Sequence, residues 1–499
     1  MEGSLLTGVF TGRDGAAGLR RGSAGTAIRV AVVLLAFFLG LPLLAGSGAR
    51  AATSGTGTVA LLVQSSGPLT AGVVSEISSH ALSVSYVWPE IRALALTTTS
   101  AGASTLLADP YVALVETDGG GSAPDSGVAA NGTAATYAVP LFTSATPLES
   151  WNLQMAQTAA PGYNGTGVTV ALLDSGLPQN WDQFLPAGSV DTTYAAGFGS
   201  MGYGSYIDPV IPIVGNGGYY GLFPHGLAVS SVLVGFRSPL GPIDGSAPGA
   251  KILPIRVLNQ FNFGYFSWFI AAFLYVAHLK ESGAIPGPLV INFSIQSLGY
   301  SLILQEAIDY AISHGVLFTT IAGNFGPGFG SIAFPGSLPE SITVGAAGWV
   351  GIGESPDWVL GPVPTGDPSQ FFVDGFSGRG YLPDQVDVVA PGTYVFGEWA
   401  IGPGFSEGHE VAFPAFDNFI AGTSFACPHV AGIVARMLEK DPGLSQSQAE
   451  AILKGTALPI PDNPYGLSLS IGYVFPWDIF ASGSGLVQGV DAVAATPAA

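Results

Sequence analysis

The sequence predicts an α/β fold with a mostly parallel central sheet, because short, almost continuously apolar segments alternate with apolar helical segments. Residues 168–173 and 315–322 are such short segments, and central parallel strands have this composition because both of their faces are buried. The first of these strands runs into Asp174, at the carboxyl edge where open α/β sheets place their sites. Helical runs are expected at residues 225–235, 266–279 and 424–437.

The amino-terminal segment is predicted to be a secretory signal peptide that covers residues 1–51. Four arginines precede an apolar run at residues 30–45, and residues 49–51 offer a small-x-small cleavage site. The apolar run is also long enough for an uncleaved membrane anchor, so cleavage and anchoring both remain open. Either outcome predicts an extracellular location for the rest of the chain.

Residues 57–118 are expected to form a separate small α+β domain. Their pattern has the order β-α-β-β-α-β, which is that of a ferredoxin-like fold. The stretch that follows begins with Gly, Ser and Ala and is predicted to be a linker over residues 119–144. Strands are expected at residues 58–63, 82–88, 91–97 and 111–116, and helices at 70–79 and 103–107.

The most informative stretch is residues 421–432, which contains Ser424 at the predicted first turn of a helix. Gly422 allows the backbone to approach a ligand closely, and Pro428 is tolerated because it lies early in the helix. Free backbone N–H groups and the positive end of the helix dipole lie beside such a serine, where they stabilise an alkoxide or an oxyanion. Ser424 is therefore the candidate nucleophile, and an ordinary helix N-cap is the alternative.

A serine nucleophile needs a base, and the base needs a group that orients it. Among the six histidines, His225 is the candidate base because it opens its helix directly after Pro224. Asp174 is the candidate orienting carboxylate, and a strand-ending turn residue is the alternative. His429 lies on the helix of Ser424 and is expected to face away from it, and the other histidines are expected to be surface or core residues.

Asn324 is the candidate donor to an oxyanion. It follows the predicted strand at residues 315–322 and lies in a Gly-rich turn. From that edge its side-chain N–H can reach the same oxygen as the backbone N–H of Ser424. The alternative is simple turn chemistry, which also favours asparagine in Gly-rich segments.

Together these residues resemble the subtilisin-like serine proteases, the subtilases, in content and in order. Asp174, His225 and Ser424 follow the Asp…His…Ser order of subtilisin. Further segments resemble the family motifs G-x-A-P-x-A, V-I-N-x-S, D-x-x-A-P-G and G-x-G-x-V, and they lie at residues 245–250, 290–294, 387–392 and 483–487. The resemblance implies a three-layer α/β/α peptidase domain with a mostly parallel central sheet over residues 145–499. It also relates residues 57–118 to the family's inhibitory propeptide.

The activity that the resemblance implies is that of a secreted serine endopeptidase, which hydrolyses peptide bonds through a serine acyl-enzyme. His225 would take the proton of Ser424, Asp174 would orient the imidazole, and Asn324 would bind the oxyanion. The chain would be made as a proenzyme that its own propeptide inhibits, and it would cut itself between about residues 119 and 150. Its partners would be protein or peptide substrates. A non-catalytic binding relative of the same fold, and a serine esterase or peptide ligase, are the alternative functions.

The resemblance also assigns substrate-binding residues. Residues 262–266 resemble the edge strand with which an extended peptide pairs, and Phe266 and Ile295 suggest apolar pockets. Two departures from the family pattern are present: Gln296 replaces a glycine of the pocket wall, and residues 226–228 read Gly-Leu-Ala where the family has Gly-Thr-His. The substrate-binding residues implied in this way are Gly264, Phe266, Ser294, Ile295, Gln296 and Gly323.

Composition limits the partners and cofactors. A formal net charge of −20 argues against a nucleic-acid partner. The single cysteine, Cys427, rules out a disulfide within the chain and is expected to be a packing residue. Catalysis by the predicted residues needs no cofactor. The sequence leaves open whether the protein binds a structural calcium ion. No segment before Gly245 matches the family's main calcium loop, and no metal-binding residue is assigned.

Overall fold

The structure is a computed structural model of the chain. It describes residues 57–123, 146–199, 204–207, 224–238, 241–355, 357–381, 385–398, 419–469 and 472–499, all within the compact unit Ser54–Ala499. The predicted signal segment and most of the predicted linker lie outside the described residues. Among the described residues, no helix is both long enough and apolar enough to cross a membrane.

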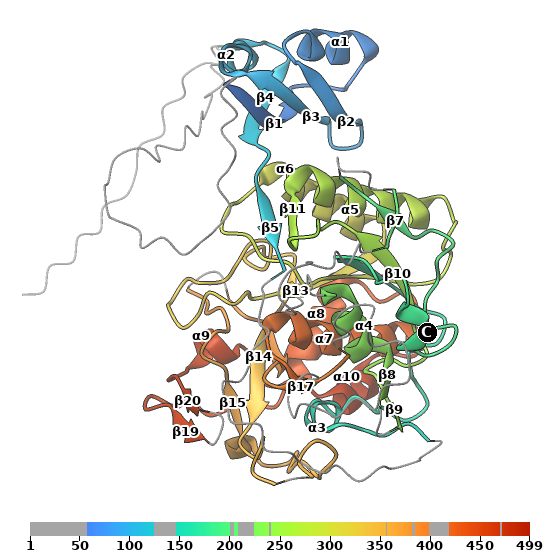
Figure 1. The fold of residues 1–499 in the computed structure, drawn as a ribbon, viewed down its shortest axis with the longest axis vertical. Coiled ribbons are helices and arrows are strands. Elements are labelled where there is room, and N and C mark those ends of the chain that lie inside the picture. The colour runs from blue at the N-terminus through green and yellow to red at the C-terminus, as the bar shows by residue number, and fades with distance from the viewer. Residues whose placement is uncertain are drawn as a thin grey trace, which may run out of the picture. The chain divides into compact units, whose positions relative to one another are not determined.

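The first part of the described chain is one antiparallel sheet with two helices (Figure 1). Its elements are β1 (Thr58–Ser65), α1 (Ala71–Ser79), β2 (Ser83–Trp88), β3 (Ala93–Thr99), α2 (Ser100–Ala108) and β4 (Val112–Thr117). The strand order is β2-β3-β1-β4, and Ile77 and Leu106 of the helices are buried with Leu61 of the sheet. Both helices begin at a threonine, because the hydroxyls of Thr70 and Thr99 accept hydrogen bonds from first-turn N–H groups. The element order is the ferredoxin-like one that the sequence predicts.

The rest of the chain is built around an eight-stranded sheet. Its strands are β6 (Thr169–Asp174), β7 (Ala196–Gly197), β10 (Lys251–Arg256), β12 (Leu289–Phe293), β13 (Val316–Ile321), β14 (Ile342–Trp349), β15 (Phe371–Val373) and β16 (Val388–Pro391). They are ordered β15-β14-β13-β12-β6-β10-β7, and β16 also pairs with β14. Every pairing is parallel except that of β14 with β15. The predicted mostly parallel sheet is therefore confirmed.

Helices and short two-stranded pieces complete this part. The helices are α3 (Trp151–Met155), α4 (His225–Val234), α5 (Phe266–Glu281), α6 (Leu302–Ser313), α7 (Thr423–Lys440), α8 (Gln446–Thr456), α9 (Ile479–Ser482) and α10 (Gly489–Ala495), with 3-10 turns at Trp181–Gln183 and Pro368–Gln370. The two-stranded pieces are β5 (Gly120–Ser122) with β11 (Phe263–Tyr265), β8 (Phe236–Ser238) with β9 (Gly241–Ile243), β17 (Val395–Phe396) with β18 (Phe419–Ile420), and β19 (Leu467–Leu469) with β20 (Gly472–Val474).

Alternate residues of the central strands face two different helical layers. In β6, Val170 and Leu172 belong to a core shared with α4, α7, α8 and α10. Ala171 and Leu173 belong to a second core, shared with α5 and α6. Figure 1 shows these two groups of helices on opposite sides of the sheet. The predicted three-layer α/β/α arrangement is confirmed, and the burial of both faces explains why the central strands are almost continuously apolar.

The parallel pairing brings three strand ends to one edge of the sheet. β12 lies between β6 and β13, so that Asp174, Ser294 and Asn324, which end or follow these strands, leave the sheet on the same side. Helices α4 and α7 begin at this edge with His225 and with Ser424 in the first turn. The sheet thus gathers polar residues that lie far apart in the chain.

Candidate active site

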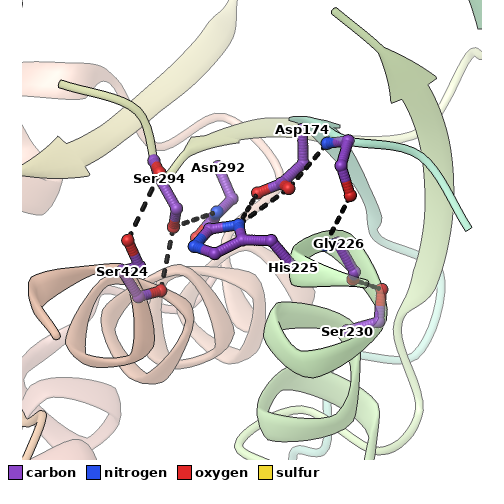
Figure 2. A network of polar contacts seen from close by, with 8 residues as sticks. Asp174, His225, Gly226, Ser230, Asn292, Ser294 and Ser424 are labelled. Atoms are coloured by element: carbon purple, nitrogen blue, oxygen red, sulfur yellow. Dashed lines mark hydrogen bonds and ion pairs between the residues drawn. The ribbon is translucent and has the colours of Figure 1, made fainter. Parts of the chain in front are cut away.

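Asp174 and His225 form a buried pair of carboxylate and imidazole. His225 Nδ1 lies 2.8 Å from Oδ1 and 2.9 Å from Oδ2 of Asp174 (Figure 2). The two side chains are 1% or less exposed. Because Nδ1 faces a carboxylate, the proton of the neutral ring is held at Nδ1, and Nε2 remains an acceptor. A ring held in this way can take up a proton at Nε2.

Polar groups next to Asp174 hold this pair in place. The Ser175 N–H donates to Asp174 Oδ1 at 2.6 Å, and the Ser175 hydroxyl accepts from the Gly226 N–H at 3.0 Å. A Cβ on Gly226 would lie 2.2 Å from the Gly176 carbonyl oxygen, so this approach of α4 to the end of β6 requires glycine. The Ser230 hydroxyl donates to the Gly226 carbonyl at 2.6 Å. Ser175 and Ser230 carry no sequence signal beyond the place of Ser175 directly after the strand-ending aspartate.

Ser424 lies in the first turn of α7, where a proline alters its hydrogen bonding. Pro428 has no N–H and cannot donate to the Ser424 carbonyl four residues earlier. Instead, the Ser294 hydroxyl donates to that carbonyl at 2.9 Å, and the Ser424 hydroxyl donates to the Ser294 carbonyl at 3.3 Å. Gly422 caps the helix with a φ of +151°, which favours glycine. These contacts fasten the start of α7 to the end of β12.

The ring of His225 lies between Asp174 and Ser424 (Figure 2). Its Nε2 atom is buried and has no hydrogen-bond partner among the described residues. A buried ring nitrogen without a partner is rare in proteins, because burial removes its hydrogen bond to water and no other bond replaces it. Among the described residues, the Ser424 hydroxyl bonds Ser294 and not His225. The site therefore combines a buried hydroxyl with an oriented, unoccupied proton acceptor.

Asn324 follows β13 and is held by two neighbours. Its backbone N–H donates to Gln296 Oε1 at 2.7 Å. Its side-chain oxygen accepts from the Thr423 N–H at 3.0 Å and from the Thr423 hydroxyl at 2.7 Å. With Oδ1 engaged by Thr423, Nδ2 points away from that residue and has no partner in the part of the chain that the structure describes. Nδ2 and the first-turn N–H of Ser424 are thus the two donors left for a ligand oxygen.

A strand of the chain itself occupies the edge where the sequence predicts a peptide substrate. β5 lies between β11 and the segment that follows β12: Gly121 pairs with Gly264, and Ser122 exchanges backbone hydrogen bonds of 2.9 and 3.0 Å with Gln296. Figure 1 shows β5 beside β11. The start of the predicted linker is therefore an ordered strand. Its backbone hydrogen bonds are of the kind that bind extended peptides to a sheet edge.

The other predicted substrate-binding residues surround β5. Phe266, the first residue of α5, is buried, and its N–H donates to the Gly119 carbonyl at 2.9 Å. Ile295 is buried, and a Cβ on Gly121 would lie 3.2 Å from its Cγ2. A Cβ on Gly323 would lie 3.1 Å from Gln296 Oε1. Phe266, Ile295 and Gly264 are brought together at β5. Gly323 lies beside the Gln296 side chain, and Ser294 lies against Ser424.

Two carboxylates just before β5 cap two helices of the larger part. Glu116 accepts from the Ser301 hydroxyl at 2.7 Å and from the Leu302 N–H at 2.9 Å, at the start of α6. Asp118 accepts from the Ser267 N–H at 2.9 Å and from its hydroxyl at 2.7 Å, at the start of α5. Negative charge is favourable at both helix starts. Burial raises the pKa of the Asp118 carboxyl, and the bonds from Ser267 act in the opposite direction.

His429 and Cys427 lie on α7 below Ser424 and are engaged elsewhere. His429 Nδ1 lies 2.8 Å from the Phe425 carbonyl oxygen, and Nε2 lies 2.9 Å from Asn152 Nδ2. Burial lowers the pKa of His429 to about 4. Burial also raises the pKa of the Cys427 thiol to about 12, so this cysteine is an inert packing residue. Neither side chain is available as a base or a nucleophile for the site.

The low pKa of His429 predicts a loss of stability in acid. The folded chain keeps this ring neutral down to about pH 4, whereas in the unfolded chain the ring binds a proton near pH 6.5. The stabilisation is therefore complete above pH 6.5 and is lost as the pH falls toward 4, by about 3 kcal/mol in total. His429→Gln should remove this share of the pH dependence when free energies of unfolding are measured between pH 7 and 4.5. The more exposed His278→Gln is the control, and equal slopes for wild type and His429→Gln would contradict the assignment.

Among the described residues, three potential metal ligands lie close to one another and away from Ser424. Glu76, His80 and Asp109 lie in the first part of the chain, and His80 Nε2 is 3.4 Å from Asp109 Oδ2. The Asp109 carboxylate also accepts from the Tyr111 N–H. These contacts assign no metal to the group, and a structural calcium ion remains an expectation without an assigned site.

Comparison with known proteins relates the chain to one family. A model of the subtilase family matches residues 165–473. Fervidolysin from Fervidobacterium pennivorans is 30% identical over 339 residues, which cover 65% of this chain and 43% of that protein. A subtilisin from Bacillus sp. (strain TA39) is 28% identical over 271 residues, which cover 52% of this chain and 56% of that protein. The chain thus spans about half the length of these two relatives.

Solved structures agree on the fold. The crystal structure of fervidolysin matches with a TM-score of 0.60 at 23% identity, covering 88% of this chain and 61% of that chain. The structure of the psychrophilic protease S41 matches with a TM-score of 0.50 at 24% identity, covering 69% of this chain and 99% of that chain. The family match, which covers more than half of the chain, confirms the resemblance drawn from the motifs: this chain belongs to the subtilase family.

Proposed function

We propose that the chain is a secreted serine endopeptidase that hydrolyses peptide bonds through Asp174, His225 and Ser424. The observation that carries the proposal is the unpartnered Nε2 of His225, buried between the Asp174 carboxylate and the Ser424 helix. Membership of the subtilase family supports the same reaction. A purely structural histidine would use both of its ring nitrogens, as His429 does.

The reaction begins when the Ser424 hydroxyl turns from the Ser294 carbonyl to His225 Nε2. The oxygen attacks the peptide carbonyl while Nε2 takes its proton, and Asp174 stabilises the imidazolium that forms. Asn324 Nδ2 and the Ser424 N–H bind the oxyanion. His225 then protonates the leaving amine, the C–N bond breaks, and an acyl ester on Ser424 remains. Water hydrolyses this ester, with His225 again taking the proton.

The same proposal makes the chain a self-inhibited precursor. Residues 57–118 act as an intramolecular inhibitor, and β5 occupies the peptide-binding edge as a substrate would. The Ala123 N–H continues this pairing with a bond of 3.1 Å to the Asn262 carbonyl, so the self-cut is expected C-terminal to Ala123. The arginine-led apolar segment at the amino terminus directs the precursor out of the cell.

Labelling with a serine-reactive fluorophosphonate, followed by mapping of the modified residue, tests the proposal together with casein hydrolysis. We expect Ser424 to be the labelled residue and casein to be cleaved at internal bonds. Absence of labelling would favour a non-catalytic binding relative. Labelling of Ser424 without peptide cleavage would favour a serine esterase, and peptide joining in the presence of an added amine would favour a ligase.

Asn324→Ala is expected to lower kcat on the order of 10²–10³-fold with little change in KM, because one oxyanion donor is lost only when the oxyanion forms. Asn324→Asp is the matched variant: its carboxylate can still accept from Thr423 but cannot donate. Initial rates on a peptide p-nitroanilide measure both constants. A loss in KM alone, or full activity of the Asp variant, would contradict the assignment.

Glu116→Ala is expected to shorten latency by about tenfold or more, because charged hydrogen bonds contribute about 1.5–3 kcal/mol and the α6 cap would be lost. The measurement is the interval between the appearance of the cut chain on a gel and the appearance of peptidase activity. Glu116→Gln keeps one acceptor and should fall between the wild type and Glu116→Ala. An unchanged interval in the Ala variant would show that the cap does not hold the inhibitor.

A further inference from the structure

Two chain segments form facing walls beside Ser424, and one side chain joins them. The first wall starts at Ser294 after β12, and the second starts at Gly323 after the neighbouring strand β13. The Gln296 side chain reaches from the first wall to the second, where its Oε1 accepts the Asn324 N–H at 2.7 Å. Gln296 is only 9% exposed. A glycine at this position would remove this side chain from between the walls, which Ser297 and Phe334 also join through backbone hydrogen bonds of 2.9 and 3.1 Å.

This bridge stands between Ser424 and a cavity. Along the first wall the order is Ser294, which contacts Ser424, then Gln296 and then Ser297, which lines the cavity. Along the second wall, Asn324 bonds Gln296, and the next residue, Phe325, lines the cavity. The cavity has a volume of about 340 Å³, which is within the range of small-molecule sites. Along both walls, the bonded pair Gln296 and Asn324 therefore lies between the contacts of Ser424 and the residues that line this space.

The pairing of β5 shows which substrate side chain points at the bridge. Ser122 lies directly opposite Gln296, and opposed residues of an antiparallel pair project to the same face. Side chains alternate along a strand, so the peptide residue two positions further on projects to this face as well. In the same register that residue lies opposite Ser294, whose carbonyl is 3.3 Å from Ser424 Oγ. It is therefore the residue whose carbonyl the serine attacks, hereafter the acyl residue.

We propose that Gln296 is a specificity-determining residue, which restricts the acyl residue to small side chains by closing the space between the two walls. This inference rests on the proposed peptidase function. Through its bond to the Asn324 N–H, Gln296 also positions the residue that binds the oxyanion.

Four peptides test the proposal on the processed enzyme. They share Gly-Ser-Ala, the residues at positions 121–123 that bond to the edge, followed by Ala, Val, Leu or Phe joined to p-nitroanilide. For the wild type we expect kcat/KM to fall as the acyl residue grows, with Ala preferred over Phe by about 10–100-fold, the usual size of such steric discrimination. Gln296→Gly should lower this Ala/Phe ratio by a similar factor, because it opens the way to the cavity.

Gln296→Glu is the matched control. It keeps the length of the side chain and an oxygen that accepts the Asn324 N–H, so the Ala/Phe ratio should stay within about twofold of the wild type. A general loss of kcat in Gln296→Gly affects all four peptides alike and cancels in the ratio, and fluorophosphonate titration gives the concentration of folded enzyme in each variant.

The outcomes separate the inference from the proposed function. A wild type that prefers Phe, or an unchanged ratio in Gln296→Gly, overturns the inference while hydrolysis that depends on Ser424 remains. If no peptide is cleaved, or if Ser424→Ala cleaves them equally well, the proposed function fails and the inference fails with it. A lowered ratio in the Gly variant together with a retained ratio in the Glu variant supports the inference.

Discussion

Ser424→Ala is expected to abolish peptide hydrolysis, lowering turnover on the order of 10⁶-fold. The variant lacks the oxygen that forms the acyl ester, while Asp174 and His225 keep their hydrogen bonds. Folding should be retained, because the hydroxyl makes one bond of 3.3 Å to the Ser294 carbonyl. Without a nucleophile the chain cannot cut itself, so it should accumulate as the uncut precursor. Rates on a peptide p-nitroanilide, mass spectrometry of the purified chain and circular dichroism measure these three results.

Ser447→Ala is the control for this variant, since Ser447 is an exposed serine on α8, away from the site. It should be processed and active like the wild type. Undiminished hydrolysis by Ser424→Ala would remove this serine as the nucleophile. A Ser424→Ala chain found at the processed size, in a host without other peptidases, would show that the chain does not cut itself.

Asp174→Asn should lower kcat by about 10⁴-fold. An amide at this position can donate its own N–H to His225 Nδ1, which would hold the ring with its proton on Nε2 and leave no acceptor for the serine. The amide also cannot stabilise the imidazolium that forms during the reaction. Rates on the same p-nitroanilide and the rate of fluorophosphonate labelling should fall together, because both depend on the activated hydroxyl.

The control for the loss of a carboxylate is Asp441→Asn at the far end of α7. It should keep its activity, because Asp441 is remote from the site and its carboxylate accepts from the nearby Gly443 N–H. A loss smaller than about tenfold in Asp174→Asn would mean that His225 is oriented by other groups. The Ser175 contacts to the same helix would then be the first to test.

Much of the fold was predictable, because the apolar pattern of a segment indicates whether it forms a strand or a helix. The strand expected at residues 168–173 is Thr169–Asp174, and the helix expected to stop at residues 441–443 ends at Lys440. A buried parallel strand and a long apolar helix leave local composition patterns that few other structures share. The grouping of Asp174, His225, Asn324 and Ser424 followed from motif order together with the rule that strand ends meet at one edge.

Contacts between distant segments were not predictable in this way. The bond from Gln296 to Asn324 and the cap of α6 by Glu116 join positions far apart in the chain, and no local pattern encodes such partners. The strand β5 was not predicted from the sequence, for a different reason. A Cβ on Gly120 would lie 2.2 Å from the Gly264 carbonyl oxygen, so the strand needs glycine to pair this closely. A Gly-rich composition is typical of a linker, and the close pairing of β5 requires the same composition.

The pairing of β5 and the two carboxylate caps belong to one covalent chain, which has a consequence for how activity would appear. If residues 57–118 inhibit the site as proposed, they face it in the intact chain at a local concentration on the order of millimolar, whatever the amount of protein. After a cut C-terminal to Ala123, the same contacts would hold two separate molecules, and their dissociation would depend on dilution. A newly cut enzyme would stay inhibited at high protein concentration and would become active on dilution.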